Sequence, residues 1–164
     1  MLFATLIALL LAHLTAALGI PNVLTFTPSD GALTLASAAA SSALPILYDS
    51  GDPDAVHIAV RTFAEDVFRV TGTKPQIYAD ALPDGTASAI IAATVGSTLV
   101  KRIRKKRSGT ERVQAVLQSA DPLAALDDQW EAFDARVIEE PLEGLKEALL
   151  VAGSDRVRVR QRHS

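Results

Sequence analysis

Short apolar runs along the chain are separated by polar segments and turn residues, and their lengths predict strands interleaved with helices. The runs that predict strands of the main sheet are residues 46–48, 76–78, 87–95, 130–138 and 148–152. Ahead of them, residues 23–26 and 32–35 flank a Pro-Ser-Asp-Gly turn and are expected to pair as a hairpin. Strands that alternate with helices favour the α/β (α+β) class, a two-layer sandwich with one mixed sheet and helices mainly on one face.

The segment after residue 52 carries the clearest helical pattern. Asp52 is expected to be the N-cap, followed by Pro53 at the first helical position, and Gly72 is expected to end the helix. Apolar residues recur at spacings of three and four and predict one inward face, made of Val56, Val60, Phe63, Val67 and Val70. The opposite side is polar and consists of His57, Arg61, Glu65 and Arg69. The pattern therefore predicts a surface position for His57.

A second helix is expected after the strand at 87–95. Ser97 is placed to cap it, and the apolar residues Leu99, Val100 and Ile103 begin it. This helix is expected to be short and to run into the basic cluster 101–107, with a separate helix over residues 108–128. The strand at 130–138 follows and is expected to end at Glu139-Glu140-Pro141.

The first nineteen residues contain no charged side chain, and the small residues around Gly19 fit a signal-peptidase site. Residues 1–19 are therefore interpreted as a cleaved signal peptide, with a retained membrane anchor as the alternative. This interpretation predicts a secreted, extracellular protein with no membrane contact after cleavage. The chain has no cysteine, so disulfides, thiol catalysis and thiolate metal sites are excluded.

The residues that could carry chemistry have simpler structural explanations. Asp52 and Asp54 favour the start of a helix, and the adjacent carboxylates at 139–140 point to opposite sides of a strand. The loop Gly153-Ser154-Asp155 lies at the end of a strand, where α/β sheets place ligands, but an ordinary turn is the simpler reading. No catalytic, cofactor-binding or metal-binding residue is therefore predicted.

The net charge of −3 conceals two basic patches, at residues 101–112 and 156–162, which hold 11 of the 16 lysines and arginines. Such clusters suit phosphate backbones or nuclear import. The export signal argues against both, and no aromatic residues interleave to stack bases. A solvated helix end is favoured, with a processing site in the secretory pathway as the alternative, and no nucleic-acid partner is expected.

Several landmarks occur in the order and spacing of a known family. They are Ile46-Leu47-Tyr48-Asp49-Ser50-Gly51-Asp52, the helix 55–70 with Thr71-Gly72-Thr73-Lys74-Pro75, Ile90-Ile91, Val95-Gly96, Trp130-Glu131-Ala132-Phe133, Glu140-Pro141-Leu142 and Leu150-Val151-Ala152-Gly153-Ser154-Asp155-Arg156. Together they resemble the start of the fungal glycoside hydrolases of family 115, the xylan α-1,2-glucuronidases. The resemblance covers residues 45–156 and is weak at 101–128.

The resemblance implies a non-catalytic N-terminal accessory domain similar to the second domain of hexosaminidases, with the catalytic barrel in the part of the family that follows. It divides the chain into a signal peptide (1–19), a strand and turn segment (20–44), an α/β domain (45–155, with a divergent basic insert at 101–128) and a divergent basic tail (156–164). Departure from the family after Arg156 implies a truncated product or a misread exon boundary, with a genuine short variant as the alternative. No family catalytic residue maps onto the chain.

Three functions remain open at this point. The first is an accessory domain of a secreted hydrolase of glucuronoxylan, inactive alone and lacking the catalytic barrel. The second is a small secreted module that binds a polysaccharide such as glucuronoxylan. The third is an unstable, non-functional truncated product with an exposed apolar sheet.

Overall fold

The computed structural model describes residue 25 and residues 32–114 and 132–154. The chain separates into two units, Met1–Asp30 and Gly31–Ser164, and every element described below belongs to the second. The expected signal peptide, the helix beyond residue 114 and the basic tail lie outside the described residues. None of the described helices is both long and apolar enough to cross a membrane.

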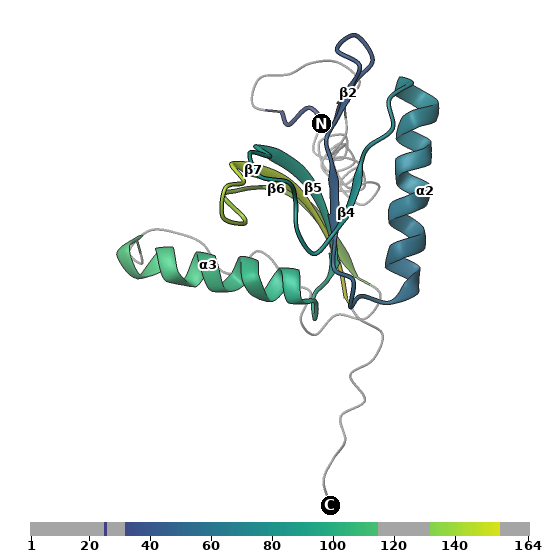
Figure 1. Cartoon of the computed structure of the whole chain (residues 1–164). Helices are drawn as coiled ribbons and strands as arrows, with labels where there is room; N and C mark the ends of the chain where they lie inside the picture. Colours follow the sequence, from purple (N-terminus) through teal and green to yellow (C-terminus); the bar gives the residue numbers. More distant parts are fainter. Residues whose placement is uncertain (1–24, 26–31, 115–131, 155–164) are drawn as a thin grey trace, which may run out of the picture. The chain divides into compact units, whose positions relative to one another are not determined.

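Within the described residues, two helices accompany a small and a large sheet (Figure 1). The elements in chain order are β1 (Ala36–Ser37), β2 (Ser42–Ala43), β3 (Ile46–Tyr48), α2 (Asp54–Thr71), β4 (Ile77–Ala79), β5 (Ser88–Thr94), α3 (Thr98–Gln114), β6 (Phe133–Glu139) and β7 (Glu147–Gly153). The large sheet has the order β4-β3-β5-β7-β6. Adjacent strands are parallel, except that β6 and β7 are antiparallel. The predicted mixed sheet of an α+β fold is confirmed.

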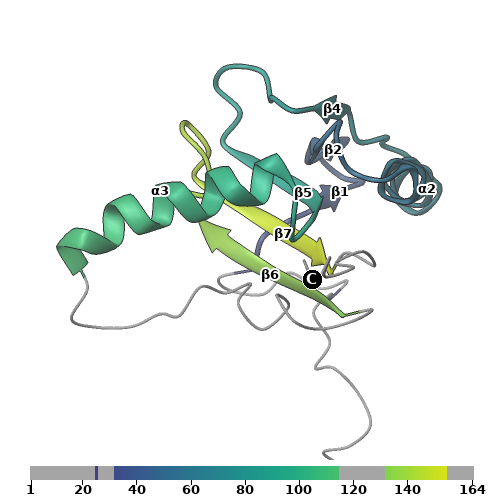
Figure 2. The ribbon, with the colours of Figure 1, turned by 90° about the horizontal axis from the view of Figure 1, so that it is seen from below.

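The central strands are apolar on both faces, and each face is covered by a different helix (Figure 2). One face packs against α3 and includes Leu47, Ile91 and Leu150, with Leu99, Val100 and Ile103 from the helix. The other face packs against α2 and includes Ile46, Ile90 and Leu149, with Val60 and Ala64 from the helix. The helices thus lie on opposite faces of the sheet and not mainly on one, which corrects this detail of the prediction.

The predicted C-cap of α2 is confirmed, but its start is wrong, and Val70, predicted on the inward face, is 71% exposed. Gly72 adopts the left-handed conformation with φ 74°, and its N–H donates to the carbonyl of Phe68 at 2.8 Å. At the other end the helix begins at Asp54 with Pro53 as the capping position, so the assignment of Asp52 as the N-cap is wrong. The Asp52 carboxylate instead bonds to Thr94 at the end of β5. Asp52 therefore does not cap its own helix but connects the loop after β3 to the end of β5.

Replacing Gly72 by alanine should lower the free energy of unfolding by about 1 kcal/mol, because a side chain disfavours the left-handed backbone. A Cβ at this position would meet no atom within 4 Å, so the loss would come from backbone conformation alone. Urea denaturation followed by circular dichroism measures it. The matched control is Gly96→Ala, since Gly96 has equally open space and an ordinary φ. Equal losses in both variants would contradict this explanation.

Helix α3 is continuous from Thr98 to Gln114, so the predicted break near residue 108 is wrong. Its cap is as predicted, because Ser97 Oγ accepts a hydrogen bond from the Val100 N–H at 3.0 Å. Ile103, inside the basic cluster, is only 1% exposed. Lys106 Nζ donates to the carbonyl of Leu142 at 3.0 Å. The start of the predicted basic insert is therefore built into the domain core.

The small hairpin lies further along the chain than predicted. Residues 32–35 form no strand, and β1 pairs with β2 in antiparallel register through Ala36 with Ala43. Most of the predicted partner strand, at 23–26, lies outside the described residues. Strand β6 begins at Phe133 within the predicted 130–138 segment and ends at Glu139 as expected.

Candidate functional site

The carboxyl ends of β3 and β5 are the part of this sheet where a ligand site is most expected. The chain leaves β3 for α2 on one face and leaves β5 for α3 on the other. In open α/β sheets such a topological switch opens a crevice at the strand ends. The loop from Asp49 to Asp52 lies here and supplies two carboxylates, both of them buried.

Asp49, in the loop after β3, caps the N-terminus of helix α3. Its Oδ2 accepts hydrogen bonds from the N–H of Thr98 and, at 3.0 Å, of Leu99, while Oδ1 accepts from the Gly51 N–H at 2.9 Å. These first N–H groups of a helix, together with its dipole, are what would otherwise attract an anion. The carboxylate of Asp49 therefore occupies the anion position that α3 offers.

Asp52 joins the same loop to the end of β5. Its Oδ2 accepts from the Thr94 N–H at 3.0 Å, and its Oδ1 accepts from the Thr94 hydroxyl. Burial raises the pKa of Asp52, and the negative charge of Asp49 adds to this, while the bonds from Thr94 and the proximity of His57 oppose it. The second carboxylate of the loop is thus also held by the fold.

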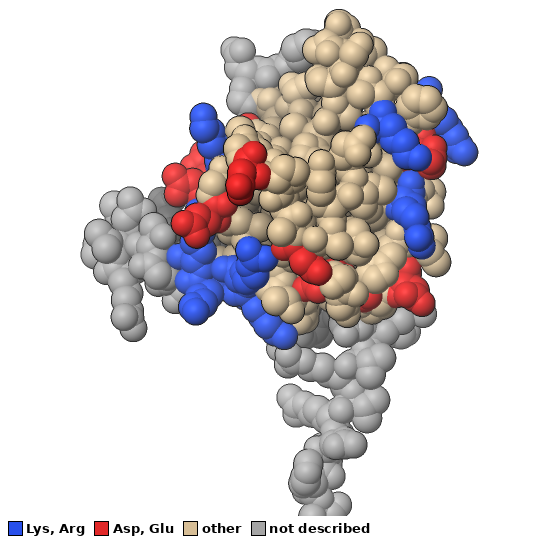
Figure 3. All heavy atoms as spheres, in the orientation of Figure 1, with Lys and Arg blue, Asp and Glu red and all other residues tan. Residues whose placement is uncertain are grey.

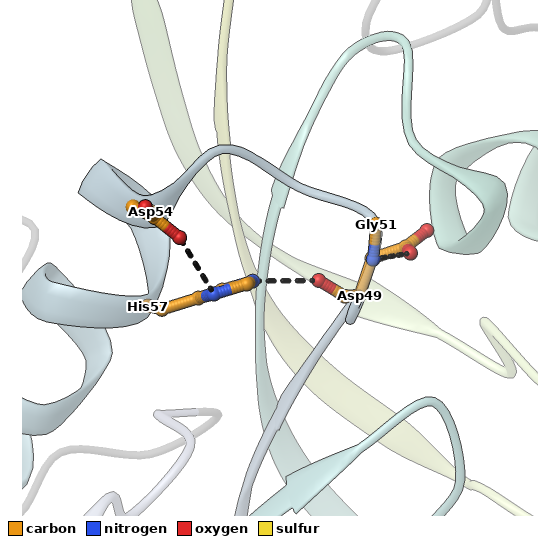
Figure 4. Close-up of polar contacts among 4 residues, drawn as sticks. All are labelled: Asp49, Gly51, Asp54 and His57. Atoms are coloured by element: carbon orange, nitrogen blue, oxygen red, sulfur yellow. Dashed lines mark hydrogen bonds and ion pairs between the residues drawn. The ribbon is translucent and has the colours of Figure 1, made fainter.

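The side chain of His57, which lies on α2, contacts the loop 49–52 (Figure 4). Its ring meets Tyr48 edge-on with centroids 4.9 Å apart, and Nε2 lies 3.2 Å from the carbonyl oxygen of Asp49. A carbonyl can only accept, so Nε2 carries the proton. Nδ1 lies 3.8 Å from the exposed carboxylate of Asp54, and the His57 side chain is only 23% exposed. His57 is therefore partly buried and not fully solvated as predicted, and its ring has a packing role.

An open hollow of about 340 Å³ borders the loop. Its lining comprises Asp49, Ser50, Gly51, Asp80, Thr98, Leu99 and Arg102. Asp80 shapes the rim with a positive φ of 63° and accepts from the Ser50 N–H at 2.8 Å. Hydrogen bonding by Ser50 lowers the pKa of Asp80. Arg102 donates to the carbonyl of Asp80 at 3.1 Å and also lines an adjoining hollow of about 170 Å³.

Ser154, the described part of the loop after β7, has a structural role. Ser154 donates its N–H to the carbonyl of Ala132 at 2.8 Å and accepts the Ala132 N–H on Oγ at 2.9 Å. These two bonds close the open end of the β6–β7 pair. Asp155 lies outside the described residues. The described part of the predicted ligand loop thus holds the sheet together.

The remaining predicted carboxylates stay apart. Asp54 is fully exposed, whereas Asp52 is buried against β5. Glu139 ends β6, and Glu140 follows with a positive φ of 46°. Within residues 32–114 and 132–154, no group of three or more potential ligands could hold a metal ion.

Sequence reasoning missed the role of Asp49. The available signal was an aspartate directly after an apolar strand with a glycine two residues later, which favours a tight loop at a strand end. The partners of Asp49 lie about fifty residues further along the chain, at Thr98 and Leu99. Only the pairing of β3 with β5 brings them together.

No protein-family model matches the chain, and a search of curated proteins finds no significant relative. The resemblance to family 115 therefore depends on the landmarks quoted from the sequence. Several of them occupy the switch point itself, namely Asp49-Ser50-Gly51-Asp52 after β3 and Val95-Gly96 after β5.

Replacing Asp52 by asparagine should change how stability depends on pH. The folded protein holds the Asp52 proton more tightly than the unfolded chain, whose reference pKa is 3.8. Its stabilising contribution is therefore complete below the unfolded pKa and is lost as pH rises through the raised folded pKa. The asparagine variant lacks this loss, so wild type should fall relative to it between pH 3 and pH 7. Urea titrations across that range measure the difference, and a constant difference would contradict the assignment.

Proposed function

We propose that residues 45–155 form the N-terminal, non-catalytic accessory domain of a secreted glycoside hydrolase that acts on glucuronoxylan side chains. On this proposal the chain is inactive alone. Its chemistry would belong to a catalytic barrel, which is the part of family 115 that carries the reaction.

One observation supports the non-catalytic part most strongly. At the carboxyl ends of β3 and β5, where an α/β sheet usually binds its ligand, both buried carboxylates accept hydrogen bonds from the fold itself. Asp49 holds the start of α3, and Asp52 holds the end of β5. A general acid or nucleophile must instead reach a substrate. The arrangement is that of a scaffold, as an accessory domain requires.

The inactivity is tested by incubating purified chain with glucuronoxylan and measuring released 4-O-methylglucuronic acid. No release above a blank is expected, and sustained turnover would contradict the proposal. The family assignment needs a separate measurement, which is sequencing of the transcript across the codons for residues 155–157. In family 115 the segment that resembles Gly153–Arg156 continues with a second arginine and then Gly-Thr-Ile-Tyr-Gly, so a transcript with that continuation would support the assignment. Transcripts of the present sequence alone would count against it.

A second candidate, a small secreted carbohydrate-binding module, has one favourable observation. Phe133 on β6 is 64% exposed, and Val137 and Val151 beside it are also exposed, on the face that α2 covers elsewhere. Aromatic rings on a sheet can stack on sugars through their apolar faces. Saturable binding to insoluble xylan that Phe133→Ala abolishes and Phe68→Ala preserves would favour this function, since Phe68 is exposed on α2 instead. Equal retention by wild type and both variants would exclude Phe133 as the platform.

A further inference from the structure

Helix α3 presents an exposed row of cations on the side opposite its packed face. Leu99, Val100 and Ile103 are buried against the sheet. The side chains of Lys101, Arg102 and Lys105 are exposed. These three residues are named the α3 basic face. Lysine and arginine side chains gather over α3 at the lower left of Figure 3, with acidic side chains beside them.

Two of the three cations of the α3 basic face, Lys101 and Lys105, have no ion pair among the described residues. On α2, Arg69 pairs with Asp66 at 3.1 Å, and Lys74, just beyond the helix, pairs with Glu65. Arg102 differs from the two lysines, because it donates to the carbonyl of Asp80 and, after the hydrogen bonds from Ser50, its charge helps to lower the pKa of the Asp80 carboxyl group. The first turn of α3 contains no acidic residue of its own. The charges of Lys101 and Lys105 are therefore the unpaired part of this face in the described residues.

The two unpaired lysines are unfavourable for the helix, because like charges four residues apart repel each other. The carboxylate of Asp49 already meets the positive end of the helix dipole, so this repulsion is the cost that remains. Local rules that a sequence breaks are typical of functional surfaces. A polyanion lying along the helix would relieve the repulsion between Lys101 and Lys105.

We propose that the α3 basic face binds a polysaccharide that carries carboxylates, such as the uronic acid side chains of glucuronoxylan. This inference rests on the proposed function, because that function supplies an acidic glycan as the surrounding substrate. Lys101, Arg102 and Lys105 pair with sugar carboxylates, and Arg102 also borders the 340 Å³ hollow beside the loop 49–52. Because the chain is acidic overall, with a net charge of −3, retention on a polyanion requires a local surface of this kind.

A glycan fits this face better than a nucleic acid does. Sequence-tolerant binding of single strands depends on aromatic side chains that stack on bases. The residues exposed along the described start of α3 and lining the adjoining hollow include no aromatic side chain. Salt-dependent pairing with carboxylates needs only the three cations.

Affinity electrophoresis tests the proposal, with glucuronoxylan, carboxyl-reduced glucuronoxylan or duplex DNA cast in the gel. The test variant is Lys101→Gln with Lys105→Gln. The control is Arg61→Gln with Arg69→Gln on α2, which removes the same charge elsewhere. Wild type and control should be retarded by glucuronoxylan, while the test variant should bind about twofold to thirtyfold more weakly, as expected for the loss of two surface ion pairs. Carboxyl reduction should abolish the retardation of wild type.

Three results would overturn the proposal. They are equal retardation with and without carboxyl groups, equal losses in test and control variants, and tighter binding to duplex DNA than to glucuronoxylan. Urea denaturation of each variant confirms that a loss does not come from unfolding. The outcome is separable from that of the proposed function. Turnover of glucuronoxylan by the chain would end the claim of inactivity, whereas dependence on carboxyl groups tests only the α3 basic face.

Discussion

Replacing Asp49 by alanine should destabilise the protein by about 2–3 kcal/mol, which we expect to be the largest effect of any polar substitution in the described residues. The carboxylate is 5% exposed and accepts three backbone N–H groups, two of them from the start of α3. Loss of a helix cap costs about 0.5–2 kcal/mol, and a buried N–H left without a partner costs about 1–3 kcal/mol. Urea denaturation, read as a shift in midpoint at constant slope, measures the loss.

The asparagine variant separates capping from charge. Asp49→Asn keeps one oxygen for the N–H groups of Thr98 and Leu99, but turns an NH₂ toward the N–H of Gly51. It should therefore lose less stability than Asp49→Ala. Asp66→Ala on α2 is the control, since its exposed ion pair with Arg69 contributes only about 0–1 kcal/mol. Similar losses for Asp49→Ala and Asp66→Ala would show that Asp49 does not fasten α3.

The same denaturation curves address the third function left open by the sequence, a product that does not fold. Phe133 and Val137 are exposed on the sheet, as that alternative expects. A buried core nevertheless covers both sides of β3, β5 and β7. One cooperative transition of the wild-type chain would count against an unfolded product, whereas a gradual loss of signal would support it.

The strands of the large sheet were predictable because their signal is local. β5 is buried on both faces, and so is β7 except at Val151, so their sequences contain continuous apolar runs such as Ala148-Leu149-Leu150. The same holds for two helix boundaries. Ser97 caps α3 and Gly72 ends α2 through bonds to residues within four positions. Where the stabilising partner is close in sequence, the pattern of residues predicts the position of the element and its boundary.

The predictions that were wrong concern partners far apart in sequence. An aspartate before proline favours an N-cap, but Asp52 bonds to Thr94, which the pairing of β3 with β5 brings near. The helices lie on opposite faces for a similar reason. The chain moves from β3 to β4 in one direction across the sheet and from β5 to β6 and then β7 in the other. Right-handed crossovers in opposite directions place their helices on opposite faces, and the strand order is not readable from local patterns.

Sequence reasoning missed the site at the switch point, because each of its residues taken alone is typical of a loop or a helix start. The predicted end of the second helix within the basic cluster was wrong for a related reason. A run of lysine and arginine suggests a solvated end, yet both residue types are good helix formers. They continue α3 past Ile103, which packs on the sheet together with Leu99 and Val100.

Replacing Ile103 by alanine should therefore lower the free energy of unfolding by about 2–4 kcal/mol, because it leaves a cavity beneath α3. Ile103 is 1% exposed and packs in the same cluster as Leu99 and Leu150. The matched control is Ile58→Ala on α2, which deletes the same atoms from a side chain that is 57% exposed. Its loss should stay below about 1 kcal/mol. If urea denaturation gave equal small losses for both, the basic segment would not belong to the core, and the cations of the α3 basic face would lose the rigid helix that aligns them.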